Sequence, residues 1–182
     1  LPSFARRQRQ MCIRDRWWLF GRPRPDLRDA CSSLARYFVT SEVSKHRFFV
    51  SLEWPADLID GSVIAVASED ALHLGVLSSS AHLGWALAAG GTLEDRPRYQ
   101  NGPCFDNFPF PHDDTGLTPA LADRIRSLAE QLDAHRKARQ AAFESVTLTG
   151  LYNVLDKLRR GEALTAKDKL LHLSLIHISE PT

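Results

Sequence analysis

The chain has 182 residues, of which 43% are hydrophobic and 25% charged, and 23 Lys and Arg against 22 Asp and Glu give a formal net charge of +1. These values fit one globular domain with or without a helical appendage, and they exclude a disordered tail, a collagen-like repeat and a disulfide scaffold. The longest apolar stretch, Ala71–Gly90, contains two histidines and three serines, so we expect no membrane span.

The cysteines indicate a reducing compartment. They stand at positions 12, 31 and 104, and their spacing matches neither a metal site nor a disulfide framework. Free thiols of this kind are usual in proteins of the cytosol. We therefore expect a cytoplasmic protein.

Both ends of the chain look foreign to the rest. Met11–Asp15 back-translates as ATG TGT ATA AGA GAC, which the AG of the Arg16 codon extends. The reverse complement of that string, CTG TCT CTT ATA CAC AT, encodes Leu173–Ile178. Natural termini have no reason to be complementary, whereas a sequencing-library adapter read through in opposite directions gives such a pair. We therefore predict that residues 1–16 and 173–182 are adapter-derived segments, to be set aside before fold reasoning.

This interpretation changes the charge and the extent of the natural protein. The two ends hold five arginines, one aspartate and one glutamate, which leaves 18 basic and 20 acidic side chains, a net of −2, in residues 17–172. The basic run at the start of the chain is then no signal for nucleic-acid binding or targeting. Because the only methionine, Met11, also lies in a foreign end, we expect an internal fragment of a longer protein.

The first half of the chain predicts a helix and three strands. After an extended segment at Arg22–Pro25, Asp26 can cap a short helix. The apolar face of that helix comprises Leu27, Ala30, Leu34 and Ala35. Strands are expected at Tyr37–Thr40 and Arg47–Leu52, the second because its apolar residues alternate. Ser62–Ser68 is apolar on both faces, which predicts the central strand of a sheet.

The second half is predicted to be mainly helical. One helix is expected at 71–89, ended by Gly90-Gly91, and then a loop at Thr92–Asp114 with four prolines. A long helix runs from Pro119 to about residue 142, with its apolar stripe at Leu121, Ile125, Leu128 and Leu132. The next helix ends at Gly161 and has Leu151, Val154, Leu155 and Leu158 on one face. Thr165 can cap a third helix. The fold class is thus α+β, a mixed sheet with packed helices followed by a helical C-terminal part.

The segment DNFPFP (Asp106–Pro111) superficially resembles the Asn/Asp-Pro-Pro-aromatic tetrapeptide of amino-methyltransferases. In that motif a side-chain oxygen and the next carbonyl accept the two hydrogens of the target amine, and the aromatic ring stacks on the flipped base. Here Phe108 separates Asn107 from Pro109, which breaks the constellation. A proline-stiffened strap that packs Phe105, Phe108 and Phe110 is the preferred interpretation.

No other chemical motif emerges. Cys104 with one of four histidines (His46, His73, His82 and His112) would make a nucleophile–base pair, but a lone cysteine among aromatics is usually a small buried hydrophobe. His73 and His82 are nine residues apart on one predicted helix and do not share a face, and Trp85 is expected in the core. No Gly-rich nucleotide loop follows a strand. We assign no catalytic, cofactor-binding or metal-binding residue to this chain.

Two basic groupings have side chains that suit nucleic acid. One is Lys45-His46-Arg47, and the other is Arg96–Asn101 (RPRYQN) in the predicted loop. Arg binds guanine in a bidentate manner, Asn binds adenine, and Tyr stacks or holds a phosphate. The DNA-binding candidates are Lys45, His46, Arg47, Arg96, Arg98, Tyr99 and Asn101. The alternative is a solvated loop with ordinary ion pairs. A third group, Arg136, Lys137 and Arg139, suits a helix C-terminus without any ligand.

The order of these pieces resembles a family of DNA methyltransferases. The segments that support the resemblance are WWLFGRPRPDLRDA, LARYFVTSEVSKHRFFV, SVIAVASEDALHLGVLSSSAHLGWALAAGG, RYQNGPCFDNFPFP, LDAHRKARQAAF and LTGLYNVLDKLRRGEALTAKDK. In this order they are similar to the target-recognition and C-terminal domains of MmeI-like DNA methyltransferases, the Type IIL restriction-modification enzymes and their methyltransferase-only relatives.

The resemblance implies that residues 17–114 are a DNA target-recognition domain and that residues 115–172 begin a truncated helical C-terminal domain. It also implies that an upstream methyltransferase domain of the same polypeptide binds S-adenosylmethionine and methylates adenine N6 in a short site of double-stranded DNA. A nuclease domain lies further upstream in bifunctional members. This chain itself is expected to bind no cofactor and to bind DNA weakly. The alternative function is a stand-alone α+β interaction domain with no DNA role.

Overall fold

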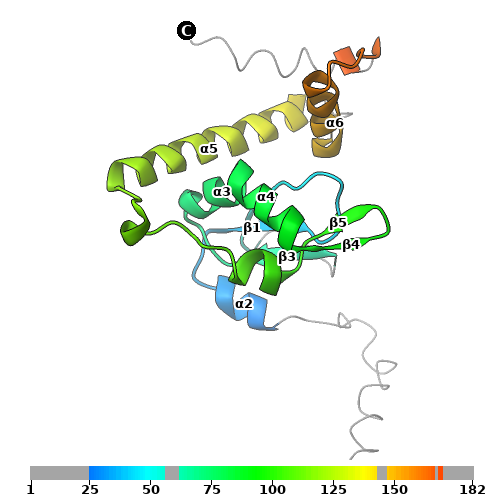
Figure 1. Ribbon diagram of the computed structural model, residues 1–182. Coiled ribbons are helices and arrows are strands. Elements are labelled where there is room, and N and C mark those ends of the chain that lie inside the picture. Colours follow the sequence, from blue (N-terminus) through cyan, green and yellow to red (C-terminus); the bar gives the residue numbers. More distant parts are fainter. Residues whose placement is uncertain (1–24, 56–61, 143–146, 167, 170–182) are drawn as a thin grey trace, which may run out of the picture.

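The computed structural model describes residues 25–55, 62–142, 147–166 and 168–169 (Figure 1). The two predicted foreign ends lie outside these residues. The helices are α2 (Pro25–Cys31), α3 (Ala71–Leu77), α4 (Ser80–Ala89), α5 (Pro119–Ala142) and α6 (Leu148–Arg159). The strands are β1 (Arg36–Ser41), β2 (Val50–Glu53), β3 (Val63–Val66), β4 (Gly91–Leu93) and β5 (Arg96–Arg98). A π-helix, η2 (Asn101–Asp106), and a 3-10 turn, η3 (Asp113–Thr115), complete the described elements. The predicted α+β class is confirmed.

The larger sheet is antiparallel, with the order β2-β1-β3. Phe38 in β1 lies opposite Ser51 of β2 and Val66 of β3. The prediction of a central strand at Ser62–Ser68 is therefore wrong, because β3 lies at an edge of the described sheet and its residues are only half-buried. The central strand is β1, whose residues from Tyr37 to Thr40 are all buried.

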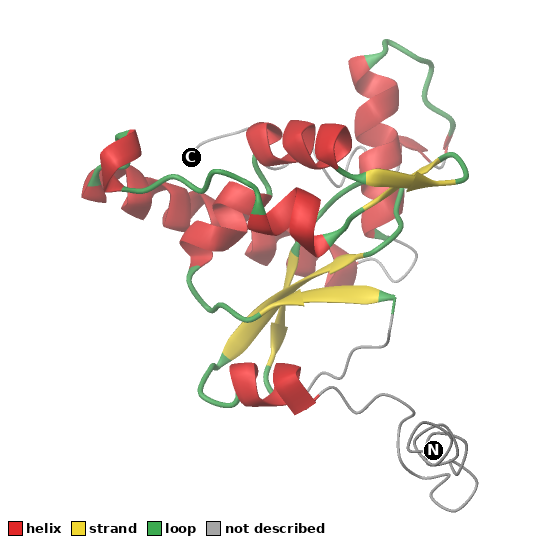
Figure 2. Ribbon diagram, turned by 60° about the horizontal axis from the view of Figure 1, so that its bottom comes forward, coloured by secondary structure: helices red, strands yellow, loops and turns green. Residues whose placement is uncertain are grey.

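Alternation along β1 separates two hydrophobic clusters, one on each face of the sheet. Tyr37 and Val39 face α2 and pack with Cys31 and Leu27. Phe38 points to the opposite face, into the main core. The other buried members of that core are Phe49, Ala71, Leu74, Leu77, Ala86, Tyr99, Cys104 and Ala129. Figure 2 shows the resulting layers, with α2 on one side of the sheet and α3 to α5 on the other.

The apolar stretch predicted as one helix at 71–89 forms two. α3 begins after Asp70, whose carboxylate accepts from the Leu72 N–H (2.8 Å). It ends at Ser78, and Ser79 then caps α4 by accepting from the His82 N–H (3.2 Å). Hydrophobic periodicity does not detect such a break, because both helices keep apolar faces, whereas a serine side chain satisfies the free N–H groups of a new helix start.

The prediction of a loop at Thr92–Asp114 is also wrong. β4 and β5 form a two-stranded hairpin in which Gly91 lies opposite Arg98 and Leu93 opposite Arg96. The hairpin starts directly after α4, and the backbone at Gly90 lies close to both elements. A Cβ atom at Gly90 would be 2.6 Å from the Ala86 oxygen and 2.7 Å from the Arg98 oxygen. Only glycine permits this close approach.

The phenylalanine strap is confirmed. The Phe110 ring contacts those of Phe105 and Phe108 edge-on, at 5.1 and 5.0 Å between centroids. The Phe108 ring also packs against His82 at 4.5 Å. Trp85 is half-buried beside this strap, and its Nε1–H donates to the Pro103 carbonyl (3.0 Å).

The leucines of the apolar stripe predicted for α5 are exposed, and the Ile125 of that stripe is half-buried against Gly75 of α3. Leu121 and Leu128 are about half exposed, at 52% and 51%. The buried α5 residues are instead Ala122, Ala129, Asp133 and Arg136. The reason is the neighbouring helix: α5 lies against α3 at Gly75, and a Cβ atom there would be 2.5 Å from Ile125 Cγ2. Small residues on the facing sides of the two helices allow α3 and α5 to approach this closely, and leucines at those positions would keep them apart.

Arg136, predicted to suit the helix C-terminus, also binds groups of two other segments of the protein. It is 5% exposed and donates to the Phe49 carbonyl (2.9 Å) and to the Tyr152 hydroxyl. Its guanidinium lies over the Tyr152 ring, 5.5 Å from the centroid, and that ring stacks on Phe48. These contacts hold α6 against the segment before β2.

The predicted helix before Gly161 is confirmed in α6. Its buried face consists of Leu148, Leu151 and Val154, whereas Leu158 is 37% exposed. Beyond α6, the Thr165 hydroxyl accepts from the Asp168 N–H (3.2 Å), the capping contact expected there. In the part of the chain that the structure describes, no helix has both the length and the apolar character needed to cross a membrane.

Two glycines make a matched test of the α3–α5 contact. Gly75→Ala should lower the free energy of unfolding by about 1–3 kcal/mol, because its Cβ overlaps Ile125. Gly84→Ala in α4, where a Cβ meets nothing within 4 Å, should raise it by roughly 0.5–1 kcal/mol through helix propensity. Urea unfolding followed by circular dichroism measures both. Equal effects of the two substitutions would contradict the close approach of α3 and α5.

Candidate nucleic-acid interface

The β4–β5 hairpin sorts the residues of the second basic grouping by alternation. Arg96 and Arg98 are exposed, whereas Pro97 is half-buried and Tyr99 is 1% exposed. Asn101, at the start of η2, is exposed as well. The two guanidinium groups of β5 therefore face outward, whereas Pro97 between them and Tyr99 after them face the core.

Tyr99 is a core residue. Its hydroxyl lies 3.0 Å from His82 Nε2, and its ring meets Phe49 edge-on with centroids 5.7 Å apart. Burial raises the pKa of the Tyr99 hydroxyl above its usual range. A side chain so enclosed does not stack on a base or hold a phosphate, so the structure does not support the predicted DNA contact by Tyr99.

Arg47 is also engaged within the protein. One of its terminal nitrogens donates to Thr40 Oγ1 (3.1 Å) and to the Ser41 carbonyl, and the other to the carbonyls of Glu42 (3.4 Å) and Pro97 (3.3 Å). The guanidinium lies 5.1 Å from the Tyr99 ring centroid. Burial lowers the pKa of Arg47. The predicted DNA contact by Arg47 is not supported, because both terminal nitrogens already bind oxygens of the protein.

Arg98 and Arg96 pair with carboxylates at the surface, and their side chains stay accessible to solvent. The Arg98 Nε–H donates to Glu42 Oε1 (2.8 Å), and Arg96 has a long ion pair with its neighbour Asp95 (4.0 Å). Arg98 and Asn101 line a pocket of about 510 Å³, together with Gln100. Guanidinium and amide groups on one edge are the groups that read base edges in DNA.

The first basic grouping packs against α6. Lys45 Nζ (2.9 Å) and His46 Nε2 (2.8 Å) both contact the Asn153 side-chain oxygen. His46 is 9% exposed, stacks on Tyr152 and lies 3.7 Å from an Asp156 carboxylate oxygen. It is thus an interior contact of α6, whereas Lys45 is exposed.

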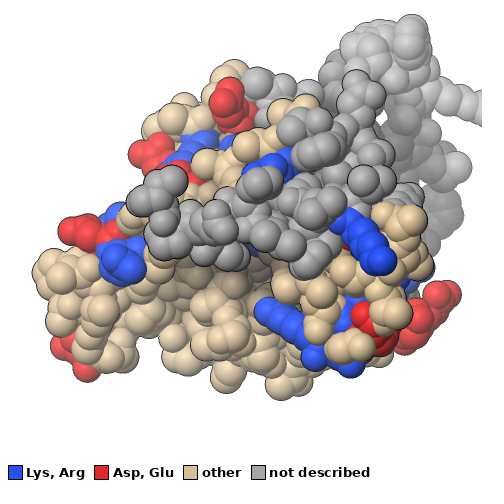
Figure 3. Space-filling view, turned by 90° about the horizontal axis from the view of Figure 1, so that it is seen from above, with Lys and Arg blue, Asp and Glu red and all other residues tan. Residues whose placement is uncertain are grey.

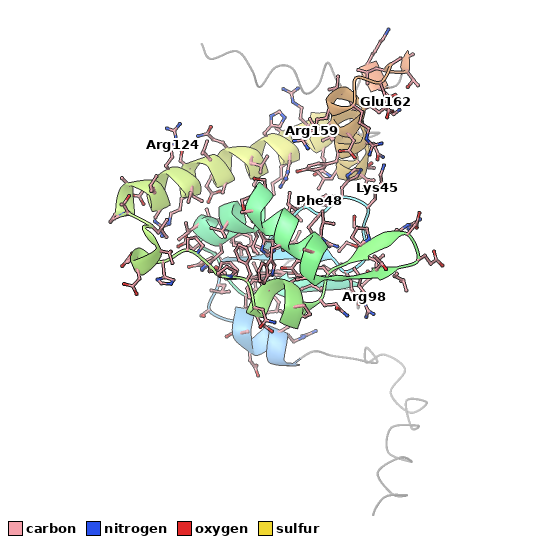
Figure 4. All side chains as sticks on the ribbon, viewed as in Figure 1. Lys45, Phe48, Arg98, Arg124, Arg159 and Glu162 are labelled. Atoms are coloured by element: carbon pink, nitrogen blue, oxygen red, sulfur yellow. The ribbon has the colours of Figure 1, made fainter. Side chains whose placement is uncertain are left out.

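The structure places the exposed parts of the two groupings next to the same hairpin, but on different sides of it (Figure 4). The Ser44 N–H donates to the Pro97 carbonyl (3.3 Å), and Val43 bridges to Arg98, so the segment before Lys45 follows β5. Figure 4 shows Lys45 and Arg98 on either side of the hairpin, and Arg124 far away on α5. Arg98 and Asn101 therefore share one pocket, and Lys45 lines another beside α6.

The surface around these residues is not uniformly basic. A pocket of about 460 Å³ beside Lys45 is lined by Lys157 and Arg160 but also by three carboxylates, those of Asp156, Glu162 and Asp168. On the face in Figure 3, Lys and Arg lie beside Asp and Glu rather than forming one positive field. Such a surface favours contact by a few placed side chains over strong attraction to phosphates.

Comparison with known proteins identifies this region. Residues 26–112 match the family model of the MmeI target recognition domain. These residues form an MmeI-like target recognition domain. The match covers the three-stranded sheet, the hairpin and the phenylalanine strap, and it falls within the predicted domain at 17–114. That boundary, and the one assigned to the helical part at 115–172, stay predictions.

A solved structure of the Type IIL restriction-modification enzyme MmeI in complex with DNA has the same fold. It superposes with a TM-score of 0.56 at 19% identity, over 78% of this chain and 17% of that chain. This share of the chain exceeds the MmeI-like target recognition domain alone, so the shared fold extends beyond it. The chain thus spans about a sixth of the length of that enzyme. A search of curated proteins gave no match.

Some residues that shape the interface were not predicted from sequence. Glu42 pairs with Arg98 through its side chain and binds Arg47 and Tyr99 through its carbonyl. No local motif distinguishes a glutamate at a strand end. Cys104, considered as a nucleophile, is buried, and its sulfur lies 3.7 Å from the Ala86 carbonyl. It is the small buried hydrophobe expected for a lone cysteine.

The buried histidine behind Tyr99 predicts acid sensitivity. Burial, and to a lesser extent the charge of Arg47, lowers the pKa of His82 to about 4. Because this lies below the unfolded value of about 6.5, neutral His82 contributes stability that is complete above pH 6.5 and lost as the pH falls toward 4. The loss amounts to about 3 kcal/mol.

Unfolding free energies measured from pH 7 to 4 test this expectation. His82→Gln should lose less stability over that range than the unsubstituted protein, even if it starts lower. His112→Gln, at an exposed position, should follow the unsubstituted protein. Parallel curves for His82→Gln and the unsubstituted protein would show that His82 does not contribute to acid unfolding.

Proposed function

We propose that this chain is the DNA-recognition part of a restriction-modification enzyme and that it reads a short sequence in double-stranded DNA. The observation that supports the proposal is the family match over residues 26–112. The related fold of MmeI, solved in complex with DNA, agrees with it. Within the domain, we propose that DNA is contacted by the exposed guanidinium groups of β5 and the exposed amide group at the start of η2.

The proposed base contacts are Arg96, Arg98 and Asn101, and Lys45 on the other side of the hairpin (Figure 4) is a proposed phosphate contact. Arg96 and Arg98 suit guanine edges, and Asn101 suits an adenine edge. Lys45 suits a phosphate, which fixes position without reading sequence. Of the seven candidates, His46, Arg47 and Tyr99 are assigned structural roles instead.

The finer proposal concerns the complete polypeptide. We infer that a methyltransferase domain outside this chain uses S-adenosylmethionine to methylate adenine N6 within the recognised site, in the cytoplasm, with or without a nuclease domain. It rests on the resemblance to the Type IIL family. In this arrangement the described domain contributes specificity, and the partner domain contributes the cofactor and the chemistry.

The first test selects binding sites from random duplexes with the complete 182-residue chain. We expect one short sequence to be enriched, with weak affinity that falls steeply as salt rises. A matched protein with glutamine in place of the five arginines at positions 6, 7, 9, 14 and 16 is the control, because a basic run attracts phosphates without regard to sequence. Failure of both proteins to enrich any sequence would favour a stand-alone interaction domain.

Substitutions then locate the contacts. Arg96→Gln and Asn101→Ala should each reduce discrimination between the selected and a scrambled duplex by about 1–3 kcal/mol. Arg124→Gln removes a charge from an exposed position of α5 far from the hairpin and should leave discrimination unchanged. Equal effects of all three substitutions would place the interface elsewhere. Fluorescence anisotropy at two salt concentrations gives the required affinities.

The methylation proposal needs the complete gene, recovered by sequencing outward from the codons for Trp17 and His172. The expressed protein should transfer methyl groups to adenine N6 in the sequence that the 182-residue chain selects. Mass spectrometry of nucleosides from methylated plasmid measures the product. Methylation of a different site would separate the recognition role of this domain from the activity of the complete protein.

A further inference from the structure

Arg47 joins two segments that are about fifty residues apart in the chain. Its partners on one side are Thr40, Ser41 and Glu42, at the end of β1, and on the other side the Pro97 carbonyl of β5. Its guanidinium also covers the ring of Tyr99. The same side chain therefore contacts the sheet, the hairpin and the residue that connects the hairpin to the core.

We propose that Arg47 is a positioning residue, which fixes the orientation of the β4–β5 hairpin on the sheet and thereby aims Arg96 and Arg98. The consequence for sequence discrimination rests on the proposed function. The claim that Arg47 fixes the orientation of the hairpin on the sheet rests on these contacts alone.

The hairpin needs such a hold because it is small. β4 and β5 have three residues each, and all three of β4 are exposed. Two-stranded hairpins of this size are marginal in water and depend on packing against the rest of the protein. The stabilising contacts must therefore lie at the base, where Tyr99 is buried and Arg47 meets Pro97.

Backbone hydrogen bonds join the hairpin to the segment after β1. The Tyr99 N–H donates to the Glu42 carbonyl (2.7 Å), and the Ser44 N–H donates to the Pro97 carbonyl (3.3 Å). These bonds join β5 to residues 42–44 only through the backbone. Arg47 adds side-chain contacts to the Pro97 carbonyl and to the Tyr99 ring, and so it ties the hairpin to the sheet at further points.

Only arginine supplies this set of contacts. A guanidinium is planar and presents five donors in a fixed fork, so its two terminal nitrogens reach acceptors on both segments. A lysine ammonium has its three donors on one atom and is strongly hydrated. The Arg47→Lys variant keeps the charge and loses the geometry, which separates positioning from charge.

The first readout needs no DNA. Hydrogen–deuterium exchange of residues 91–99 should become roughly tenfold faster or more in Arg47→Lys and Arg47→Gln, with α3 and α5 unchanged as internal references. Arg96→Gln, whose ion-pair partner is the adjacent Asp95, is the matched control and should leave hairpin exchange unchanged. Unchanged exchange in Arg47→Lys overturns the proposal, and so does global unfolding of that variant, which would give Arg47 a role in the whole fold.

The second readout measures DNA binding by the same variants of the complete chain. Arg47→Lys should lose roughly tenfold or more in discrimination between the selected and scrambled duplexes, with an unchanged slope of affinity against salt. A slope that falls by about one in Arg47→Gln but not in Arg47→Lys, with unchanged hairpin exchange, would instead make Arg47 a phosphate contact. If no protein discriminates between duplexes while exchange still rises in Arg47→Lys, the proposed function fails and the hold on the hairpin stands.

Discussion

The burial of Tyr99 is the constraint on which the candidate interface depends. Its hydroxyl meets His82 of α4 and its ring meets Phe49, so the residue that follows β5 is fixed from two directions. Because side chains alternate along a strand, fixing Tyr99 inward places Arg98 and Arg96 outward. A one-residue change of register would bury the arginines and expose the tyrosine. The burial of Tyr99 thus sets which way the exposed cations face, and Arg47 is proposed to hold the hairpin in that orientation.

Phe49 connects this interface to the helices that follow it. Its ring contacts Tyr99, and its carbonyl accepts from Arg136 of α5, which also binds Tyr152 of α6. Ala129 of α5 belongs to the same core as Phe38. Packing therefore continues across residue 114, although the family match ends at residue 112. The helical part supports the recognition domain structurally, because removing α5 would expose the main core and leave the Phe49 carbonyl without Arg136.

The sequence predicted the features that local patterns encode. The α+β class, the strand at β1, the phenylalanine strap and the span of α5 all follow from periodicity, glycine and proline. The face of α5 did not, because Leu121 and Leu128 look like a core stripe until α3 is seen to approach at Gly75. Individual site residues were harder still. Arg47 and Arg98 have the same side chain, and only the fold shows that one binds carbonyls and the other faces solvent.

The arginines thus fall into two groups, those that bind carbonyls inside the protein and those that face solvent. Only the second group can contact DNA. Arg47 and Arg136 direct their donors at carbonyls inside the protein, whereas Arg98 and Arg96 face solvent beside the carboxylates of Glu42 and Asp95. Residues 17–172 have a net charge of −2, so their basic side chains give no overall excess of positive charge for phosphates. Under the proposed function, base contacts at the hairpin supply discrimination, and affinity for the DNA backbone has to come from other parts of the polypeptide. Such a division allows the recognised sequence to change through a few hairpin residues without altering the core that aims them.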